Sequence, residues 1–239
     1  MRTACFVDGY NLFYGLLAGT GYKWLDLPKL LEHVIRVQDP SAELVSVHYF
    51  TSMVKPDLAR LGKISSEAQH TYIRALKARG VLVTEGRHRL EPGLAPTYVS
   101  GQKASRSNQT KIWLLEEKET DVNVALSMYR CAVKQQQIPP EERIRQIVLV
   151  SADTDMTPAL IALKEDFPEI RRGVILPHRE GIQREAPGSL KNEADWMRKT
   201  IKDSELAECL FPRRVPTKKK PADMPVYWNR WPTIDQAIE

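Results

Sequence analysis

The chain has 239 residues, of which 42% are hydrophobic and 27% are charged, and its formal net charge is +5. These proportions are those of an ordinary soluble globular protein, and they exclude wholesale disorder, a collagen-like chain and a membrane protein. The length suits one sizeable α/β core with an appendage. The positive charge favours a polyanionic partner, because Lys and Arg that neutralise phosphates release condensed counterions.

Cysteine usage and the N-terminal segment bear on the cellular setting. Cys5, Cys131 and Cys209 lie far apart and show no metal-ligand spacing, which predicts reduced thiols. The apolar run before Asp8 is too short for a signal peptide, and nowhere do about 18 apolar residues follow one another without interruption. We therefore expect a cytoplasmic protein that has no membrane partner.

The first half of the chain alternates strand-like and helix-like segments. Strands are expected over residues 3–8, 43–51 and 81–86, and helices over 9–19, 27–37 and 56–79. Residues 88–109 contain Pro, Gly, Ser and basic residues without periodicity, which predicts an exposed loop.

The second half continues this alternation. Strands are expected over residues 110–119, 145–152 and 171–177, and helices over 120–137, 156–167 and 189–201. Such alternation predicts a three-layer α/β/α, Rossmann-like fold with a mostly parallel sheet. Residues 1–211 are expected to form this domain. Residues 212–239 are expected to form a basic tail that docks through Tyr227, Trp228 and Trp231.

Acidic residues follow three of the predicted strands. Asp8 ends the first strand, Asp121 stands at a helix start after residues 110–119, and Asp153 and Asp155 follow residues 145–152. Each of these residues alone is explained by helix capping, for which Asp is a preferred residue. The carboxyl ends of parallel strands meet at one edge of a sheet, so we expect the four acids to gather there.

A cluster of carboxylates is costly unless a cation lies among them. An all-oxygen site suits Mg²⁺ or Mn²⁺, ions that keep several waters and bind phosphate oxygens. The predicted metal ligands are Asp8, Asp121, Asp153 and Asp155, and Asn11 is expected to orient a carboxylate or a bound water. These five residues form the predicted catalytic site for phosphodiester hydrolysis by a metal-activated water.

Three segments carry a family resemblance: FVDGYN, KETDV before a helix, and VSADTDMTP. In this order they resemble the motifs of NYN domains in the PIN-like nuclease superfamily, and SLKNEADW resembles the closing pattern through Ser189, Leu190 and Asp195. The resemblance covers roughly residues 1–211 and implies a PIN-like fold and a metal-dependent ribonuclease. One departure is Ser127, which occupies a position where family members often carry a further acid.

Two other functions compete with the ribonuclease. A PIN-like domain that has lost an acid can still bind RNA as a non-catalytic module. The string from Asp153 to Thr157 also fits the DxDxT start of haloacid-dehalogenase-like phosphatases. The sequence contains no P-loop, GxGxxG or GxSxG motif, which argues against nucleotide-driven motors, dinucleotide oxidoreductases and acyl-transfer hydrolases.

The expected nucleic-acid partner is single-stranded or structured RNA. The predicted phosphate contacts are basic residues in or near the expected loop and on a later edge loop: Arg87, Arg89, Lys103, Arg106, Lys111 and Arg184. Tyr10, Tyr14 and Trp113 are candidates for stacking on unpaired bases, although aromatic residues at such positions more often belong to the core. The sequence does not predict an oligomeric state.

Overall fold

The structure, a computed structural model, describes residues 1–182 and 185–230. Six strands form one parallel sheet in the order β3-β2-β1-β6-β7-β8. Their bounds are β1 Arg2–Asp8, β2 Glu43–Thr51, β3 Leu82–Glu85, β6 Gln146–Val150, β7 Arg171–Ile175 and β8 Trp196–Arg198. The sheet grows from β1 to β3 on one side and from β6 to β8 on the other, so the order reverses between β1 and β6. In open parallel sheets, ligands bind beyond the strand ends at such a reversal.

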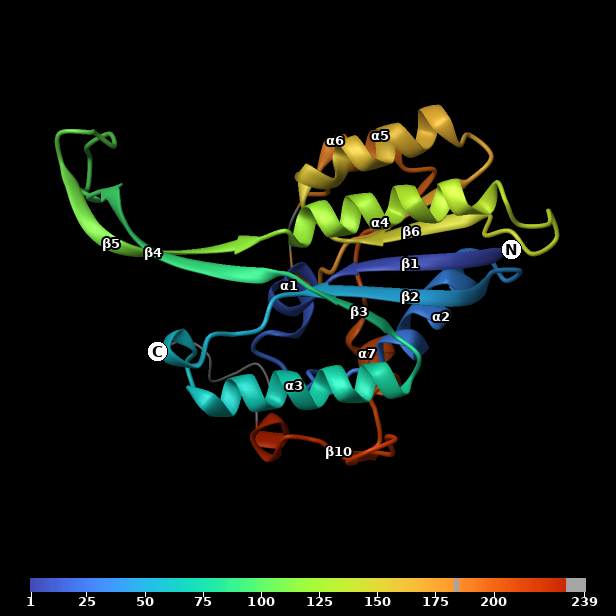
Figure 1. Cartoon of the computed structure of the whole chain (residues 1–239), viewed down its shortest axis with the longest axis horizontal. Coiled ribbons are helices and arrows are strands. Elements are labelled where there is room, and N and C mark those ends of the chain that lie inside the picture. The colour runs from blue at the N-terminus through green and yellow to red at the C-terminus, as the bar shows by residue number, and fades with distance from the viewer. Residues whose placement is uncertain (183–184, 231–239) are drawn as a thin grey trace.

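Helices cover both faces of the sheet (Figure 1). One face carries α4 Thr120–Gln135, α5 Thr157–Asp166 and α6 Gly188–Glu193, and the other carries α2 Leu27–Gln38, α3 Lys63–Ala78 and α7 Asp203–Glu208. The remaining helical turns are α1 Gly9–Leu12, the π-helical η1 Phe13–Leu17, and the 3₁₀ turns η2 Pro56–Leu58, η3 Thr154–Met156 and η4 Val226–Arg230. The predicted three-layer α/β/α fold is confirmed. Within the described residues, no helix has both the length and the apolar character needed to cross a membrane.

The two faces of the sheet have separate apolar cores. Along β1, Cys5 and Val7 pack into the core on the α2 face, whereas Ala4 and Phe6 pack into the core on the α4 face. Successive side chains of a strand point to opposite faces, so a strand buried on both sides must be apolar throughout. This requirement explains the continuous apolar run before Asp8.

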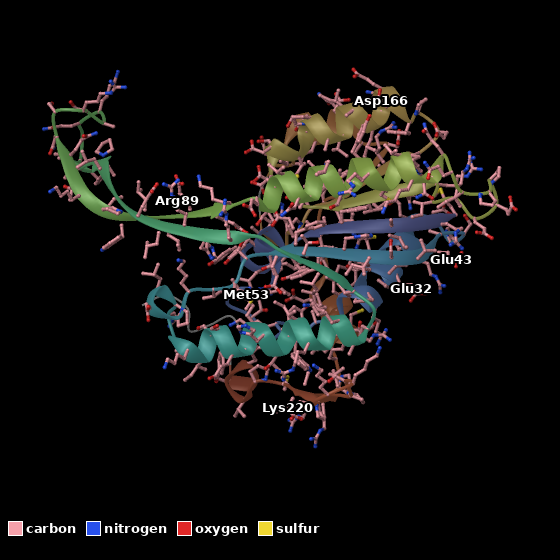
Figure 2. All side chains as sticks on the ribbon, viewed as in Figure 1. Glu32, Glu43, Met53, Arg89, Asp166 and Lys220 are labelled. Carbon is pink, nitrogen blue, oxygen red and sulfur yellow. The ribbon has the colours of Figure 1, made fainter. Side chains whose placement is uncertain are left out.

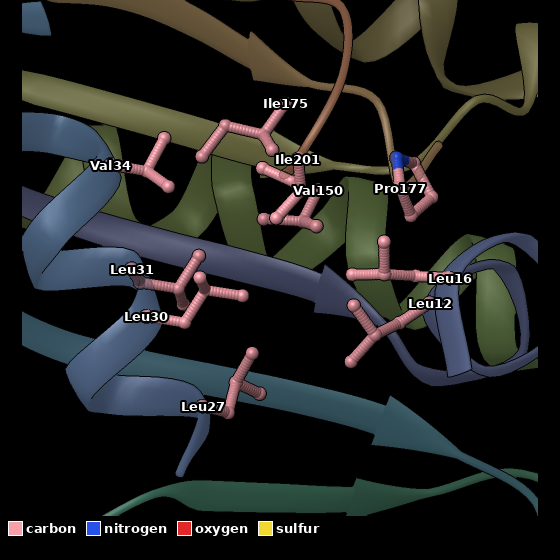
Figure 3. A pocket seen from close by; sticks show the side chains of 10 residues that line it. All are labelled: Leu12, Leu16, Leu27, Leu30, Leu31, Val34, Val150, Ile175, Pro177 and Ile201. Atoms are coloured by element: carbon pink, nitrogen blue, oxygen red, sulfur yellow. The ribbon is translucent and has the colours of Figure 1, made fainter. Parts of the chain in front are cut away.

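A small apolar cavity lies between α2 and the sheet (Figure 3). Its lining includes Leu12, Leu31, Val150 and Ile175, and its volume is about 10 Å³. That volume is about what a single water occupies and is far below that of a ligand pocket. The cavity is therefore a packing defect of the core and not a binding site.

Residues 88–96 of the segment expected to be a loop belong to a strand, so this prediction was wrong for that part and correct for residues 97–108. β4 Arg87–Pro96 pairs antiparallel with β5 Gln109–Lys118, and the two strands pair with each other instead of joining the central sheet. They form a long arm that projects from the body (Figure 1). Figure 2 shows Arg89 on this arm. The loop proper is confined to residues 97–108 at the tip.

The prediction of a helix over residues 189–201 is also wrong in part. α6 ends at Glu193, and the chain continues as β8, which pairs parallel with β7. After α7, the short strands β9 Arg214–Val215 and β10 Ala222–Asp223 pair with each other. Docking of the tail is confirmed for Trp228, which is buried and lies 6.0 Å from Trp24 between ring centroids. Trp231 lies outside the described residues.

Candidate functional site

Three carboxylates meet beyond the ends of β1 and β6. One carboxylate oxygen from each of Asp8, Asp121 and Asp153 lies within 4.8 Å of the others. Asp8 is buried, Asp153 is half-buried and Asp121 is exposed. The structure thus brings together three of the four predicted acids. Asp155 is exposed and is not a member of this group.

Asp8 is held by its neighbours in a fixed orientation. Its carboxylate accepts hydrogen bonds from the backbone N–H of Asn11 at 3.0 Å, from Nδ2 of Asn11 at 2.7 Å and from the hydroxyl of Ser151 at 3.2 Å. Oδ1 of Asn11 accepts a bond from the N–H of Ala152 at 3.3 Å. Asn11 therefore ties the end of β1 to the end of β6, which agrees with the orienting role expected from the sequence.

A glycine directly after Asp8 makes this arrangement possible. A Cβ atom at Gly9 would lie 2.6 Å from the carbonyl oxygen of Phe50 and 2.7 Å from ring atoms of Tyr49. Both contacts are far too short for carbon. Glycine thus lets α1 begin against the end of β2, and this places Asp8 at the reversal in strand order.

Asp153 keeps the capping role that the sequence allows for it. Its Oδ1 accepts a hydrogen bond from the N–H of Asp155 at 3.0 Å, and its own N–H donates to the Ser151 hydroxyl at 3.0 Å. Ser151 therefore contacts both Asp8 and Asp153. The sequence interpretation missed Ser151, although a polar residue that ends a buried strand was a signal for it.

The carboxylates of Asp8, Asp121 and Asp153 repel one another, and this repulsion changes their pKa values. Partial burial, together with the charges of Asp8, Asp153, Glu117 and Asp155, raises the pKa of Asp121 to about 6. Burial also raises the pKa of Asp8, although the hydrogen bonds from Asn11 and Ser151 act in the opposite direction. Negative charges held this close together are a recognised feature of functional sites, because a bound cation relieves their repulsion.

Asp121 is joined to the arm by a strained residue. Glu119, between β5 and α4, has φ of 76°, a left-handed conformation that is uncommon for residues other than glycine. Its carboxylate pairs with Arg87 at 2.7 Å. Strain of this kind persists only where surrounding contacts enforce it. The root of the arm and the start of α4 are therefore held together next to Asp121.

Glu117 is a further acid that the sequence interpretation missed. Its Oε1 accepts a hydrogen bond from the Thr120 hydroxyl at 2.5 Å, and that hydroxyl lies 3.3 Å from the hydroxyl of buried Ser52. The charge of Glu117 contributes to the raised pKa of Asp121. The signal for Glu117 was its place four residues before Asp121, which we read as part of a strand and nothing more.

Aromatic side chains lie beside these polar contacts. The hydroxyl of Tyr10 donates to the carbonyl of Ser52 at 3.1 Å and lies 3.3 Å from Nε2 of His88. Tyr14 stacks on Tyr10 with ring centroids 5.8 Å apart and remains 68% exposed. His88 also lies 2.9 Å from the carbonyl of Met53 through its Nδ1. The first turns after β1 thus present an aromatic surface next to the arm.

The predicted phosphate contacts are spread along the arm. Arg87 and Arg89 are both ion-paired, Arg87 with Glu119 and Arg89 with Glu91 at 2.6 Å. Lys103 and Arg106 lie in the tip loop, and Lys111, like Trp113, lies on β5. Arg184 lies outside the described residues. No observation tests RNA binding by these residues.

Asp195, which belongs to the family resemblance, lies away from the carboxylates. Asp195 bonds to the backbone N–H of Arg172 at 2.6 Å and to its guanidinium at 2.7 Å. These residues lie at the amino ends of β7 and β8, whereas the carboxylate cluster lies beyond the carboxyl ends of the parallel strands. Their ion pair therefore has a structural role. Ser127 is half-buried in α4.

The raised pKa of Asp121 predicts how stability depends on pH. A carboxyl whose pKa rises on folding holds its proton more tightly in the folded state, so its contribution to stability is greatest at low pH and falls as the pH rises through about 6. With EDTA present, we expect Asp121→Asn to raise the melting temperature at pH 7.5 and to change it little at pH 4.5. Thermal unfolding of both proteins across this range checks the expectation, and an equal shift at both pH values would contradict it.

Comparison with known proteins corrects the functional prediction. No protein family model matches the chain, so the resemblance to NYN domains stays a prediction. The chain is 33% identical over 255 aligned positions to the 6-hydroxy-3-succinoylpyridine 3-monooxygenase HspA of Pseudomonas putida, covering 100% of this chain and 78% of that protein. A crystal structure of a protein of unknown function from Vibrio parahaemolyticus aligns with a TM-score of 0.46 and 17% identity, covering 84% of this chain and 93% of the other.

A monooxygenase transfers oxygen to its substrate and is an oxidoreductase. The sequence analysis considered oxidoreductases only as dinucleotide-binding enzymes and argued against them because no GxGxxG motif is present. The predicted metal-dependent nuclease or ribonuclease activity is therefore wrong, and neither the RNA-binding module nor the phosphatase is retained. The error has a physical cause: carboxylates at the ends of parallel strands specify an oxygen-rich, negatively charged site, and such a site serves many reactions. The chain belongs to the family of the 6-hydroxy-3-succinoylpyridine 3-monooxygenase HspA.

Proposed function

We propose that this chain is a monooxygenase that acts on a hydroxylated aromatic nitrogen heterocycle. The observation that carries the proposal is the 33% identity to HspA, which extends over the whole of this chain. A monooxygenase places one atom of O₂ in its substrate and releases the other as water, which requires two electrons and two protons. The proposal therefore needs a two-electron donor; the experiments below supply a reduced nicotinamide dinucleotide, and the missing GxGxxG motif argues only against the dinucleotide-binding fingerprint of Rossmann domains.

The name of the relative indicates which ring chemistry to expect. Positions 3 and 6 of a pyridine, the oxygenated carbon and the hydroxyl-bearing carbon in that name, stand opposite each other across the ring. A ring hydroxyl that loses its proton donates electron density to the opposite carbon, which then reacts more readily with an electrophilic oxygen. We therefore expect a substrate with a ring hydroxyl opposite to the position of oxygenation.

We place the ring hydroxyl of the substrate beside Asp8, Asp121 and Asp153. Their carboxylates fit Mg²⁺ or Mn²⁺, because three oxygen donors lie within 4.8 Å of one another and repel each other when no cation is present. A bound divalent cation supplies positive charge that favours the deprotonated form of an oxygen ligand. Asn11 and Ser151 keep Asp8 in place by hydrogen bonds.

Tyr14 is suited to bind the aromatic ring. Its side chain is 68% exposed and stacks on Tyr10, so one ring face is available to a planar molecule. Offset stacking of two aromatic rings contributes about 1 kcal/mol beyond the area that it buries.

Replacing Tyr14 with Ala is expected to raise KM by about fivefold to tenfold, because the loss of about 1 kcal/mol of stacking free energy weakens substrate binding by that factor. We expect kcat to remain nearly unchanged. Steady-state kinetics with Tyr98→Ala as the control checks this result, since Tyr98 is an exposed aromatic at the tip of the arm. A fall in kcat without a change in KM would contradict a role in substrate binding.

The activity itself is tested with the purified chain, Mn²⁺, a reduced nicotinamide dinucleotide and a series of hydroxypyridines that carry an acyl side chain. Oxygenation at the acyl-bearing carbon must break the bond between the ring and the acyl carbon: one oxygen atom enters this bond to give an aryl ester, and water then releases the acyl group as a carboxylic acid. We therefore expect O₂ consumption that requires the substrate, matches oxidation of the electron donor one for one, and yields one carboxylic acid for each ring product. Isomers whose hydroxyl is not opposite the acyl group should react poorly. Consumption of O₂ at the same rate without substrate, or with none of the series, would overturn the proposal.

We also propose a cytoplasmic location for this reaction. Cys5, Cys131 and Cys209 are free thiols, as the sequence predicted. Burial raises the pKa of Cys131 to about 11, which keeps this thiol protonated and unreactive at neutral pH. Free thiols of this kind persist in a reducing compartment.

A further inference from the structure

The proposed reaction needs a group that takes the proton from the ring hydroxyl of the substrate. Asp8, Asp121 and Asp153 are poorly suited to this role, because they fit a divalent cation and nearby positive charge favours the ionised form of a carboxyl. A general base must lie within hydrogen-bond reach of the proton that it removes. A separate titratable side chain beside the cluster is therefore required.

Glu117 lies between the carboxylate cluster and the aromatic surface, at the root of the arm where β5 leads into α4 (Figure 1). Burial raises the pKa of Tyr10, and the charge of Glu117 is the next cause of this shift. After burial, the same charge is also among the causes that raise the pKa values of Asp121 and Tyr49. Coulomb interactions weaken with distance, so the Glu117 carboxylate is close to all three groups. It is therefore near the place proposed for the substrate ring, between the cluster and Tyr14.

A chain of polar contacts fixes Glu117 in this place. Its Oε1 accepts the hydrogen bond from the Thr120 hydroxyl at 2.5 Å, and that hydroxyl lies 3.3 Å from the Ser52 hydroxyl. The backbone carbonyl of Ser52 accepts a hydrogen bond from Tyr10 at 3.1 Å. His88 lies directly opposite Glu117 in the arm, so both share one face of the ribbon, and its Nε2 lies 3.3 Å from the Tyr10 hydroxyl. The face of the arm that carries Glu117 is therefore the one that meets the aromatic surface.

The second carboxylate oxygen of Glu117 is available to accept a proton. Of the neighbouring acids, Glu116 pairs with Lys118 at 2.6 Å. Glu119 pairs with Arg87 at 2.7 Å. Glu117 is exposed, and with the residues that the structure describes its Oε2 forms neither a hydrogen bond nor an ion pair. Glu117 thus combines a fixed orientation with an unoccupied acceptor atom, and a general base requires both.

We propose that Glu117 is the catalytic base that removes the proton from the ring hydroxyl of the substrate. This inference rests on the proposed oxygenation and assigns a residue to its first step. The O–H bond breaks, the proton moves to Oε2 of Glu117, and the electron pair stays on the ring oxygen, from which it is delocalised to the opposite carbon. Where the hydroxyl is adjacent to the ring nitrogen, the proton can reside on that nitrogen instead, and its removal gives the same anion.

The absorption spectrum of the bound ring tests this step without turnover, because an ionised hydroxypyridine absorbs at longer wavelength than a neutral one. An acyl-substituted hydroxypyridine is titrated with the full chain and Mn²⁺, without O₂ or an electron donor, at a pH at which the free ring is neutral. We expect an ionised ring on the wild type and a neutral ring on Glu117→Gln, whose amide oxygen still accepts the hydrogen bond from Thr120. Glu116→Gln is the matched control, since Glu116 is also exposed but lies on the other face of the arm, and it should bind an ionised ring.

Kinetics with rings of different acidity separate a base from a structural residue. Glu117→Gln should lower kcat by about 100-fold, the size of effect typical of a general base. The loss should become smaller with chlorinated hydroxypyridines, because their ring hydroxyl is more acidic and needs less help to ionise. A structural role would lower kcat equally for every ring. The affinity of Glu117→Gln for Mn²⁺ should equal that of the wild type, since Glu117 is not one of the three clustered carboxylates.

The outcomes distinguish failure of this inference from failure of the proposed function. A neutral ring on the wild type, or an ionised ring on Glu117→Gln, would overturn the role of Glu117 and leave the proposed oxygenase intact. An ionised ring on that variant together with a neutral ring on Asp155→Asn would move the role to Asp155, the other acid beside the cluster. Failure of every hydroxypyridine to bind the wild type would overturn the proposed function, and this inference with it.

Discussion

Asp153→Asn is expected to lower kcat for ring oxygenation by on the order of 10²–10³-fold, an effect typical of losing one electrostatic group in a reaction centre. The substitution removes a negative charge at nearly constant shape. Its side-chain oxygen can still accept the hydrogen bond from the N–H of Asp155, so the η3 turn should remain intact. The same variant should lose most of its Mn²⁺ affinity, because one of the three carboxylate ligands becomes neutral.

Steady-state kinetics and a thermal-shift titration with Mn²⁺ measure the two effects separately. Asp57→Asn is a suitable control, since Asp57 is an exposed acid in η2, away from the cluster. Mn²⁺ should raise the melting temperature of the wild type and of the control, because a ligand that binds only the folded state stabilises it. Loss of the Mn²⁺ effect with unchanged turnover would show that the reaction does not need the cation.

Trp24→Ala is expected to lower the free energy of unfolding by about 3–5 kcal/mol, the usual cost of deleting a large buried aromatic side chain. Trp24 is 1% exposed, and its ring centroid lies 5.6 Å from that of Phe211 and 6.0 Å from that of Trp228. Its indole N–H donates to the carbonyl of Pro212 at 2.8 Å. The substitution therefore opens a cavity and also releases the tail from the body.

Denaturant unfolding of Trp24→Ala and of Tyr98→Ala measures this contribution. Tyr98 is 89% exposed, so its removal should change the free energy of unfolding by less than about 0.5 kcal/mol. Limited proteolysis should cut the Trp24→Ala variant earlier after residue 211 than the wild type. Equal stability of the two variants would mean that the tail and Trp24 do not support each other.

The positions of Asp8 and Asp153 were predictable because they depend on local sequence and one topological rule. An apolar run that ends in an acid gives a buried strand with a carboxylate at its end, and parallel strands bring such ends together. Asp155 lies outside the group of three carboxylates, although its charge contributes to the raised pKa of Asp121. Sequence proximity alone does not determine where a side chain points within a turn. Glu117 was missed because its closeness to Asp121 depends on how the arm joins α4.

The arm was misread because its strand β4 contains residues that usually signal turns. Pro92, Gly93 and Pro96 interrupt the alternation expected of a strand. They are tolerated because, among the residues that the structure describes, the outer edges of the ribbon pair with no other strand. Trp196 and Met197 were assigned to a helix because the preceding residues have helical spacing. Pairing with β7 decides their conformation, and a single sequence contains no direct signal of that partner.

Isotopically labelled dioxygen offers the most direct test of the proposed function. The purified chain is incubated with labelled O₂, unlabelled water, Mn²⁺, a reduced nicotinamide dinucleotide and an acyl-substituted hydroxypyridine. Mass spectrometry then measures the mass of the ring product. The proposal predicts one labelled oxygen atom in each ring product and none when only the water is labelled. Label entering from water, or a product that forms equally well without O₂, would contradict a monooxygenase.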